Sequence, residues 1–216
     1  MFDFTKTASQ ELTKRRGPLE ASAVRKLVDA IIPARPGTAP DYEILRPMGA
    51  RKYTKPGATT YAVRTEPGVN AIVYRLDGKA RYSRPPLGPG RCLLYVAHQS
   101  SDVELRDDPF VKELMEREPA TEVYAVDVRG IGESRPDTCG VNQYLTPYGN
   151  DYFYAAHSIM LGDSYPTQRA FDVLQVIAWL KALGRTEIHL VANGWGTIPA
   201  TLAAVATTRV AHWRGQ

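Results

Sequence analysis

The sequence contains few cysteines and no arrangement of them that suits a metal. Cys92 and Cys139 are the only two among 216 residues, and neither has histidine or cysteine neighbours at the spacing of a metal site. We therefore expect neither a disulfide framework nor a structural metal, and we predict no cofactor. Cys92 lies within an apolar strand pattern, which predicts a buried, reduced thiol.

Long apolar runs are also absent. The first 17 residues hold no stretch of the length of a signal-peptide core, and nothing downstream approaches a membrane span. We therefore expect a cytoplasmic chain with no membrane partner, although a removed export signal would leave the same sequence.

Charge of one sign is not concentrated. Lys and Arg number 27 against 23 Asp and Glu, and the only tight basic cluster is Lys14-Arg15-Arg16. Nucleic-acid binding is typical of a clustered basic surface, so we predict no nucleic-acid partner. Nothing in the sequence indicates the oligomeric state.

What is present is sufficient for one substantial core, because 44% of the residues are hydrophobic. We divide the chain into an N-terminal helical flank and linker, residues 1–40, and a core, residues 41–216. In the flank, apolar residues recur at helical spacing from Pro18 to Ile32, where Pro33 and Pro36 end the pattern.

The core begins with a hairpin and continues as alternating strands and helices. Thr60–Arg64 and Ala71–Leu76 read as strands on either side of a Glu66-Pro67-Gly68 turn. Further strands are predicted at Cys92–Ala97, Glu122–Asp127 and Glu187–Ala192, and helices at Pro109–Arg117, Arg169–Leu183 and from Thr197 to about Ala206. This order predicts an α/β fold, with a mostly parallel sheet flanked by helices.

An aromatic segment interrupts this order between Cys139 and Gln168. We expect a loop and a short helix over the carboxyl edge of the sheet. Core packing and a ligand pocket both explain its aromatic residues, which are Tyr144, Tyr148, Tyr152, Phe153 and Tyr154.

The join between the last predicted strand and helix is the most informative segment. Ala192-Asn193-Gly194-Trp195-Gly196 has the small-X-nucleophile-X-small pattern of a nucleophile elbow, in which a sharp turn leaves no room for flanking side chains. The nucleophile position, Gly194, carries no hydroxyl. Glycine adopts the positive φ of that position without strain, so the substitution keeps the turn and removes the reacting group. A plain glycine-rich connection, or an anion-binding turn at a helix N-terminus, is the alternative reading.

Two further loops carry polar residues at the ends of strands. Val126 to Ser134 forms a tight turn containing Asp127, Arg129, Gly130, Gly132 and Ser134. We expect Asp127 and Arg129 to bind loop backbone groups and each other rather than to catalyse, and Ser134 to be a turn residue. Leu94 to Asp102 contains His98 and Gln99, and for His98 a structural hydrogen bond is favoured over a role as general base.

Together, these loops and the elbow resemble the α/β-hydrolases, and residues 91–206 resemble bacterial esterases of the acetyl xylan esterase and dienelactone hydrolase type. The Asp-X-Arg-Gly-X-Gly-X-Ser loop and the His98 loop stand where that family has them, except that Gln99 replaces the usual glycine. The resemblance implies a partial α/β-hydrolase fold. It also implies oxyanion donation from the N–H groups of Trp195 and the His98-Gln99 loop, Asn193 in the pocket, and a small-molecule ester or carbohydrate ester as substrate.

The rest of that family's catalytic triad has no counterpart in this sequence. Its acid and histidine follow later strands, whereas only Thr207 to Gln216 follow the elbow helix here. We expect Val210 to Trp213 to begin a further strand, His212 to be an exposed tail residue, and the chain to be truncated. It should be inactive as an ester hydrolase. A non-catalytic module that binds a ligand or a protein, and an inert fragment, remain the alternatives.

Overall fold

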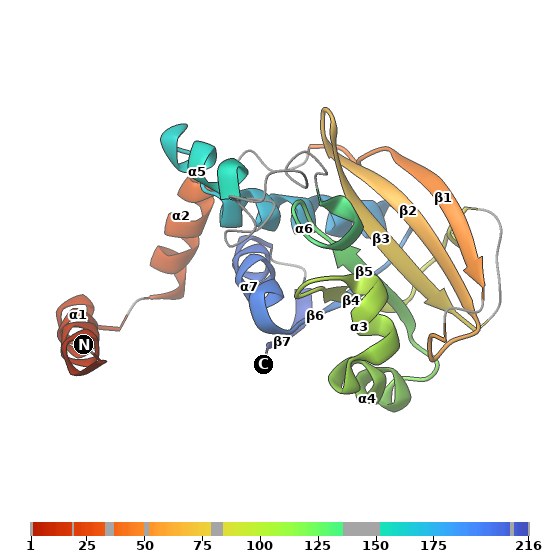
Figure 1. The fold of residues 1–216 in the computed structure, drawn as a ribbon, viewed down its shortest axis with the longest axis horizontal. Coiled ribbons are helices and arrows are strands. Elements are labelled where there is room, and N and C mark those ends of the chain that lie inside the picture. Colours follow the sequence, from red (N-terminus) through yellow and green to blue (C-terminus); the bar gives the residue numbers. More distant parts are fainter. Residues whose placement is uncertain are drawn as a thin grey trace, which may run out of the picture.

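A single seven-stranded sheet organises the chain, in the order β1-β2-β3-β5-β4-β6-β7 (Figure 1). The computed structural model describes residues 2–18, 20–32, 37–49, 52–78, 84–135, 152–207 and 210–215. The strands are β1 (Tyr42–Gly49), β2 (Gly57–Glu66), β3 (Val69–Asp77), β4 (Arg91–Val96), β5 (Glu122–Asp127), β6 (Glu187–Ala192) and β7 (Val210–Gly215). The helices are α1 (Phe2–Arg16), α2 (Ala21–Ile31), α3 (Ser101–Asp107), α4 (Pro109–Arg117), α5 (Tyr152–Met160), α6 (Tyr165–Ala182) and α7 (Thr197–Ala206), with short 3-10 turns η1 (Gly132–Ser134) and η3 (Gly194–Gly196).

The predicted hairpin forms the antiparallel half of the sheet. Glu66 pairs with Val69 across a turn in which Gly68 has a φ of +79°. Pro67 fixes its own φ at a negative value, and Gly68, the next residue, tolerates a positive φ. A turn of this kind requires that combination. β1 pairs with β2, and β3 pairs with β5, also antiparallel. The sheet is therefore mixed, and its parallel half is β5-β4-β6-β7.

Helices cover both faces of the parallel half. Along β4, Cys92, Leu94 and Val96 belong to one buried cluster, together with residues of α2, α6 and α7. The alternate residues Leu93 and Tyr95 belong to a second cluster, with residues of α3 and α4. A strand covered on both faces needs apolar side chains at every position, which explains the continuous apolar run. Cys92 is buried and reduced as predicted, and burial raises the pKa of its thiol to about 12.

Part of the N-terminal flank belongs to the core. Val28 and Ile32 are buried in the same cluster as the α6 and α7 side chains, and Figure 1 shows α2 beside α7. Helix α2 therefore packs its narrow apolar stripe against the layer of helices, α6 and α7, that covers this face of the sheet. Leu27 and Ile31 on the same helix remain exposed.

An aromatic cluster anchors the longest helix, α6. The Trp179 ring lies 5.4 Å from Tyr42, 5.3 Å from Tyr61 and 5.9 Å from Tyr124, measured between ring centroids. Trp179 is only 1% exposed. Tilted and edge-on contacts of this kind add to the stabilisation from burial. The cluster joins β1, β2 and β5 to one helix.

Several boundaries differ from the predicted ones. α6 begins at Tyr165, four residues before the predicted start, because Pro166 is accepted in the first turn of a helix. α1, β1 and α3 were not predicted. The strand predicted from Val210 is β7, so His212 pairs with His189 in the sheet rather than lying in a tail. Cys139, Tyr144 and Tyr148 lie outside the described residues.

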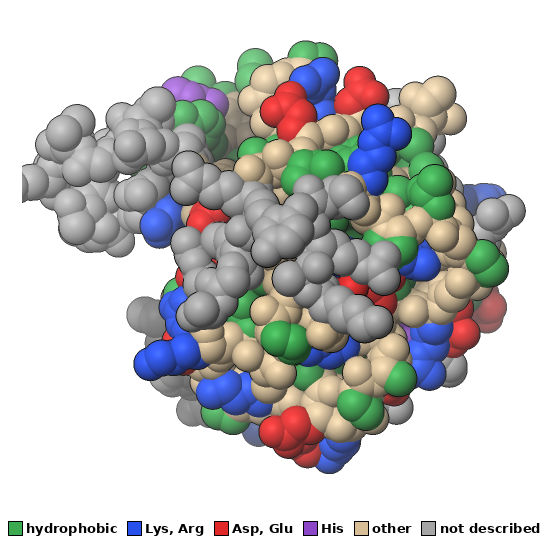
Figure 2. All heavy atoms as spheres, turned by 90° about the vertical axis from the view of Figure 1, so that its right-hand side faces the viewer, with side chains coloured by type: hydrophobic (Ala, Val, Ile, Leu, Met, Phe, Trp, Pro, Cys, Tyr) green, Lys and Arg blue, Asp and Glu red, His purple; other side chains and the backbone are tan. Residues whose placement is uncertain are grey.

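The face drawn in Figure 2 carries mixed charge. Basic side chains there lie among acidic ones rather than in a patch of one sign. In the described part of the chain, no helix is both long enough and apolar enough to cross a membrane.

The Trp179 cluster leads to a stability prediction. Trp179→Ala should lower the free energy of unfolding by about 3–5 kcal/mol, because it leaves a cavity among three tyrosines. Trp195→Ala is the matched control, since Trp195 is 67% exposed, and should change stability by less than about 0.5 kcal/mol. Urea denaturation followed by circular dichroism measures both variants. Equal losses in the two would contradict the packing described here.

Candidate functional site

The predicted elbow is a tight turn between β6 and α7. Asn193 is extended, Gly194 has a φ of +53°, and the chain then enters η3. The Thr197 hydroxyl donates to the Gly194 carbonyl at 2.7 Å, and the Gly196 N–H donates to the Asn193 carbonyl at 3.1 Å. The left-handed φ at Gly194 is the conformation that an elbow position requires and that glycine adopts readily.

Gly196 is required by the close approach of the turn to β4. A Cβ atom at this position would lie 2.4 Å from the Val96 carbonyl oxygen and 2.7 Å from that of Ala97. Real Cβ atoms do not approach backbone oxygens so closely, so any side chain here would force α7 away from the sheet. Ala192, at the other side of the turn, is fully buried.

The His98 side chain lies directly over Gly194. A Cβ atom on Gly194 would lie 2.6 Å from Nδ1 and 2.8 Å from Cγ of the imidazole. The Trp195 N–H donates to the same Nδ1 at 3.0 Å. Because Nδ1 accepts this bond, the neutral ring carries its proton on Nε2. The space where an elbow side chain would stand is therefore occupied by histidine.

The buried carboxylate of Glu104 holds the loop that carries His98. Its two oxygens accept the N–H groups of His98, Gln99 and Ser100 at 2.9, 2.6 and 2.9 Å. They also accept the Tyr95 hydroxyl at 2.6 Å. Burial, and then this bond to Glu104, raise the pKa of Tyr95 well above its ordinary value. The backbone N–H groups of His98 and Gln99, which the sequence predicts as oxyanion donors, thus both donate to the Glu104 carboxylate.

Asp127 ties the neighbouring loop to the same edge. Its carboxylate is fully buried and accepts the N–H groups of Ser101 at 2.7 Å and Glu133 at 3.0 Å. Gly132 packs against it so closely that a Cβ atom would lie 2.1 Å from Oδ2. The Gly132 N–H donates to the Gln99 carbonyl at 2.8 Å, which joins the two loops. Burial raises the pKa of Asp127 to about 6, against the lowering effect of its two N–H donors.

Arg129 pairs with Asp172, not with Asp127. Its Nε and Nη2 contact the two Asp172 oxygens at 2.8 and 2.6 Å, and its backbone N–H donates to Oδ2 at 3.0 Å. Glu66 lies 2.9 Å from Nη1. Burial opposes the charge of Arg129, but the carboxylates outweigh it, so the pKa of the guanidinium is raised. The expected Asp127–Arg129 pair does not form because each side chain has a nearer partner.

The predicted site residues separate into two groups. Gly194, Trp195, His98, Gln99 and the Asp127 loop meet at the carboxyl ends of β4, β5 and β6. Asn193 lies beside them, with its Nδ2 3.5 Å from an Asp108 oxygen. In contrast, Arg129, Gly130 and Ser134 lie away from this group and line a cavity beside α5. The Ser134 hydroxyl donates to the Asn70 carbonyl at 2.5 Å.

Two residues that organise this edge were missed by sequence reasoning. Glu104 and Asp172 are both buried carboxylates that bind backbone N–H groups. A signal for Asp172 exists, since it is an acidic residue within the apolar run Phe171 to Leu174. Among the residues that the structure describes, no cluster of three or more His, Cys, Asp or Glu side chains has the arrangement of a metal site.

Comparison with known proteins finds similarity in structure alone. No family model and no curated protein matches the sequence. A putative acetyl xylan esterase from Bacteroides fragilis superimposes with a TM-score of 0.62 at 16% identity, covering 89% of this chain and 51% of that one. Acetyl xylan esterase 1 from a Thermoanaerobacterium species gives 0.53 at 14% identity, over 91% and 57%. An acetyl xylan esterase from a Paenibacillus species gives 0.51 at 14% identity, over 91% and 58%.

These likenesses establish the fold. The sheet and its covering helices share the fold of these esterase structures, in agreement with the predicted partial α/β-hydrolase fold. The chain spans between 51% and 58% of the length of these three structures.

Asp127 gives the site a pH dependence. A carboxyl whose pKa is raised on folding, here from 3.8 to about 6, stabilises the fold fully below its unfolded pKa and loses that contribution as pH rises through 6. Between pH 4 and pH 7 the wild type should lose about 2 kcal/mol of stability relative to Asp127→Asn, which does not titrate there. Denaturant titrations of both proteins across that range measure the difference. If the wild type instead became more stable relative to Asp127→Asn as the pH rises, that result would contradict the raised pKa.

Proposed function

We propose that this chain is an α/β-hydrolase-fold protein related to carboxylic ester hydrolases of the acetyl xylan esterase type, and that its elbow does not catalyse ester hydrolysis. The fold shared with three acetyl xylan esterases supports the relationship. The observation that carries the second part is the His98 imidazole over Gly194, bound to the Trp195 N–H.

Ester hydrolysis at an elbow depends on a nucleophile and on N–H donors aimed at the developing oxyanion. Gly194 supplies no nucleophile. The Trp195 N–H already donates to His98, and the N–H groups of His98 and Gln99 donate to Glu104. A substrate carbonyl would have to displace these acceptors before it could be bound. The site therefore lacks the preorganised donors that stabilise an oxyanion without rearrangement.

A non-catalytic module that binds a small molecule is the second candidate function. It is favoured by a cavity of about 600 Å³ whose lining includes no elbow residue. A small-molecule ester or carbohydrate ester fits the relationship to the esterases. Binding in that cavity would require neither a nucleophile nor an oxyanion site.

The elbow proposal predicts the outcome of an activity assay. With p-nitrophenyl acetate, purified protein should show no hydrolysis above Gly194→Ala, because loss of the nucleophile from a catalytic triad removes on the order of 10⁶ in rate. His98→Ala is the control for direct attack by imidazole on an activated ester, and circular dichroism establishes that each variant is folded.

Turnover that is clearly faster than the buffer rate and that is lost in folded Gly194→Ala would contradict the proposal. Slow turnover that is lost in His98→Ala but retained in Gly194→Ala would show imidazole chemistry independent of the elbow position.

A further inference from the structure

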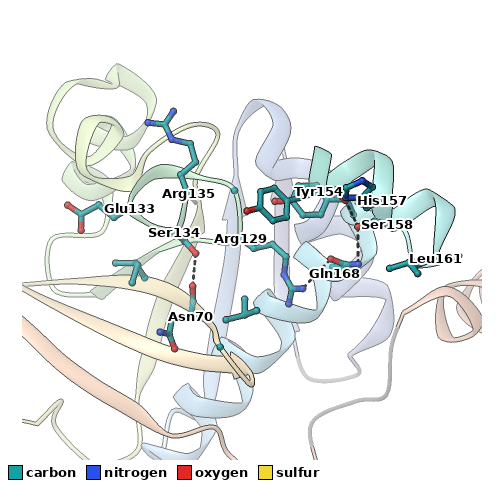
Figure 3. A pocket seen from close by; sticks show the side chains of 15 residues that line it. Asn70, Arg129, Glu133, Ser134, Arg135, Tyr154, His157, Ser158, Leu161 and Gln168 are labelled. Atoms are coloured by element: carbon teal, nitrogen blue, oxygen red, sulfur yellow. Dashed lines mark hydrogen bonds between the residues drawn. The ribbon is translucent and has the colours of Figure 1, made fainter. Parts of the chain in front are cut away.

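The cavity lies away from the elbow, between the β2–β3 turn, the loop after β5, helix α5 and the start of α6 (Figure 3). Its volume of about 600 Å³ lies within the range of roughly 300–1,000 Å³ that is typical of small-molecule pockets. Neither the elbow nor the His98 loop contributes a lining residue. What the cavity binds is therefore independent of whether the elbow is catalytic.

Apolar and aromatic side chains form much of the wall. Val69 and Ile72 contribute from β3, Leu161 from the end of α5, and Tyr165 from the start of α6. The Tyr154 ring adds a second aromatic surface, and its hydroxyl points toward the Ser134 side of the cavity in Figure 3. Such walls favour a ligand that buries apolar surface.

Three polar side chains of the wall, Gln168, Ser158 and Arg129, have hydrogen-bond partners within the protein. Gln168 Nε2 donates to Asp163 at 2.8 Å and to the Ser158 hydroxyl at 3.3 Å. Ser158 in turn donates to the Tyr154 carbonyl at 2.7 Å, and Gln168 Oε1 accepts from Arg129 Nη1 at 3.2 Å. Because these groups have partners, an apolar ligand can cover them without leaving them unsatisfied.

Arg129 determines which charge the cavity accepts. Its guanidinium faces two carboxylates, Asp172 and Glu66, at 2.6 and 2.9 Å. Four of its five N–H groups are taken by these two residues and Gln168 within the described part of the chain, which leaves one on Nη2. An anionic ligand would place a third carboxylate around one cation, whereas a neutral acceptor would bind the remaining N–H without that repulsion.

The other charged side chains of the lining do not reverse this preference. Glu133 and Arg135 are of opposite sign, and Figure 3 shows both charged ends directed away from Arg129. His157 stands at the α5 side, with its ring stacked 6.0 Å from Phe153. The charges of the lining therefore give the interior no strong preference for an anion.

We propose that this cavity binds a neutral, largely apolar small molecule carrying a carbonyl-type oxygen, which accepts from the remaining Nη2 N–H of Arg129. The apolar body of the ligand packs between Val69, Leu161 and Tyr165. A carboxylate of the same size and shape binds more weakly, because Asp172 and Glu66 already neutralise the guanidinium.

Two probes of matched size test the charge preference. 2-Naphthaleneacetamide and 2-naphthaleneacetate differ in charge at neutral pH but hardly in volume, and calorimetry measures their binding to the full chain. The amide should bind with 1:1 stoichiometry and at least about tenfold more tightly than the carboxylate. Equal or tighter binding of the carboxylate, or no binding of the amide at about 1 mM, would overturn the proposal.

A pair of neighbouring variants tests the location. Leu161 lines the cavity and Met160 does not, yet they are 83% and 81% exposed, so substituting either leaves the core unaltered. Leu161→Asp should weaken amide binding by at least about fivefold, since it puts a charge on the apolar wall. Met160→Asp should change it by less than about twofold. The same affinity in both variants would place the amide elsewhere and overturn the assignment.

Discussion

The hydrogen bond from the Trp195 N–H to Nδ1 of His98 joins the ends of two neighbouring parallel strands, β4 and β6, at the turn that the sequence predicts as a nucleophile elbow. One such bond contributes only about 0.5–1.5 kcal/mol to stability. Its importance is geometric, because the same imidazole occupies the space that a Cβ atom on Gly194 would need and engages the Trp195 N–H. The turn therefore has the positive φ expected of an elbow, and a side chain of the same chain occupies the space beside Gly194.

Buried carboxylates hold the loops around that bond. Glu104 gathers three successive N–H groups of the His98 loop, Asp127 links this loop to the turn after β5, and Asp172 fixes Arg129. Each carboxylate accepts N–H donors of the protein, which offsets the cost of burying its charge. The same kind of pairing operates in the cavity beside α5. There Glu66 and Asp172 neutralise Arg129, which in our proposal offers a ligand one N–H donor and little net charge.

The sequence predicted the elements whose local chemistry is unambiguous. The Pro67-Gly68 turn, the apolar run of β4 and the small residues around Gly194 each indicated the structure that is found. Contacts between distant segments were not predictable in the same way. The partner of Arg129 lies 43 residues away, and the ring that covers Gly194 lies nearly a hundred residues before it. α3 was missed because its start depends on Ser100 as N-cap, in a segment read as a loop.

The direct measurement of the central claim is amide hydrogen exchange at Trp195, compared between wild type and His98→Ala. The indole of Trp195 is largely exposed, so protection of its backbone N–H must come from the acceptor on His98. The account predicts slow exchange in the wild type and exchange at least about tenfold faster in folded His98→Ala, with the Gly196 amide unchanged. Equal exchange at Trp195 in the two proteins would show that the imidazole does not close the elbow.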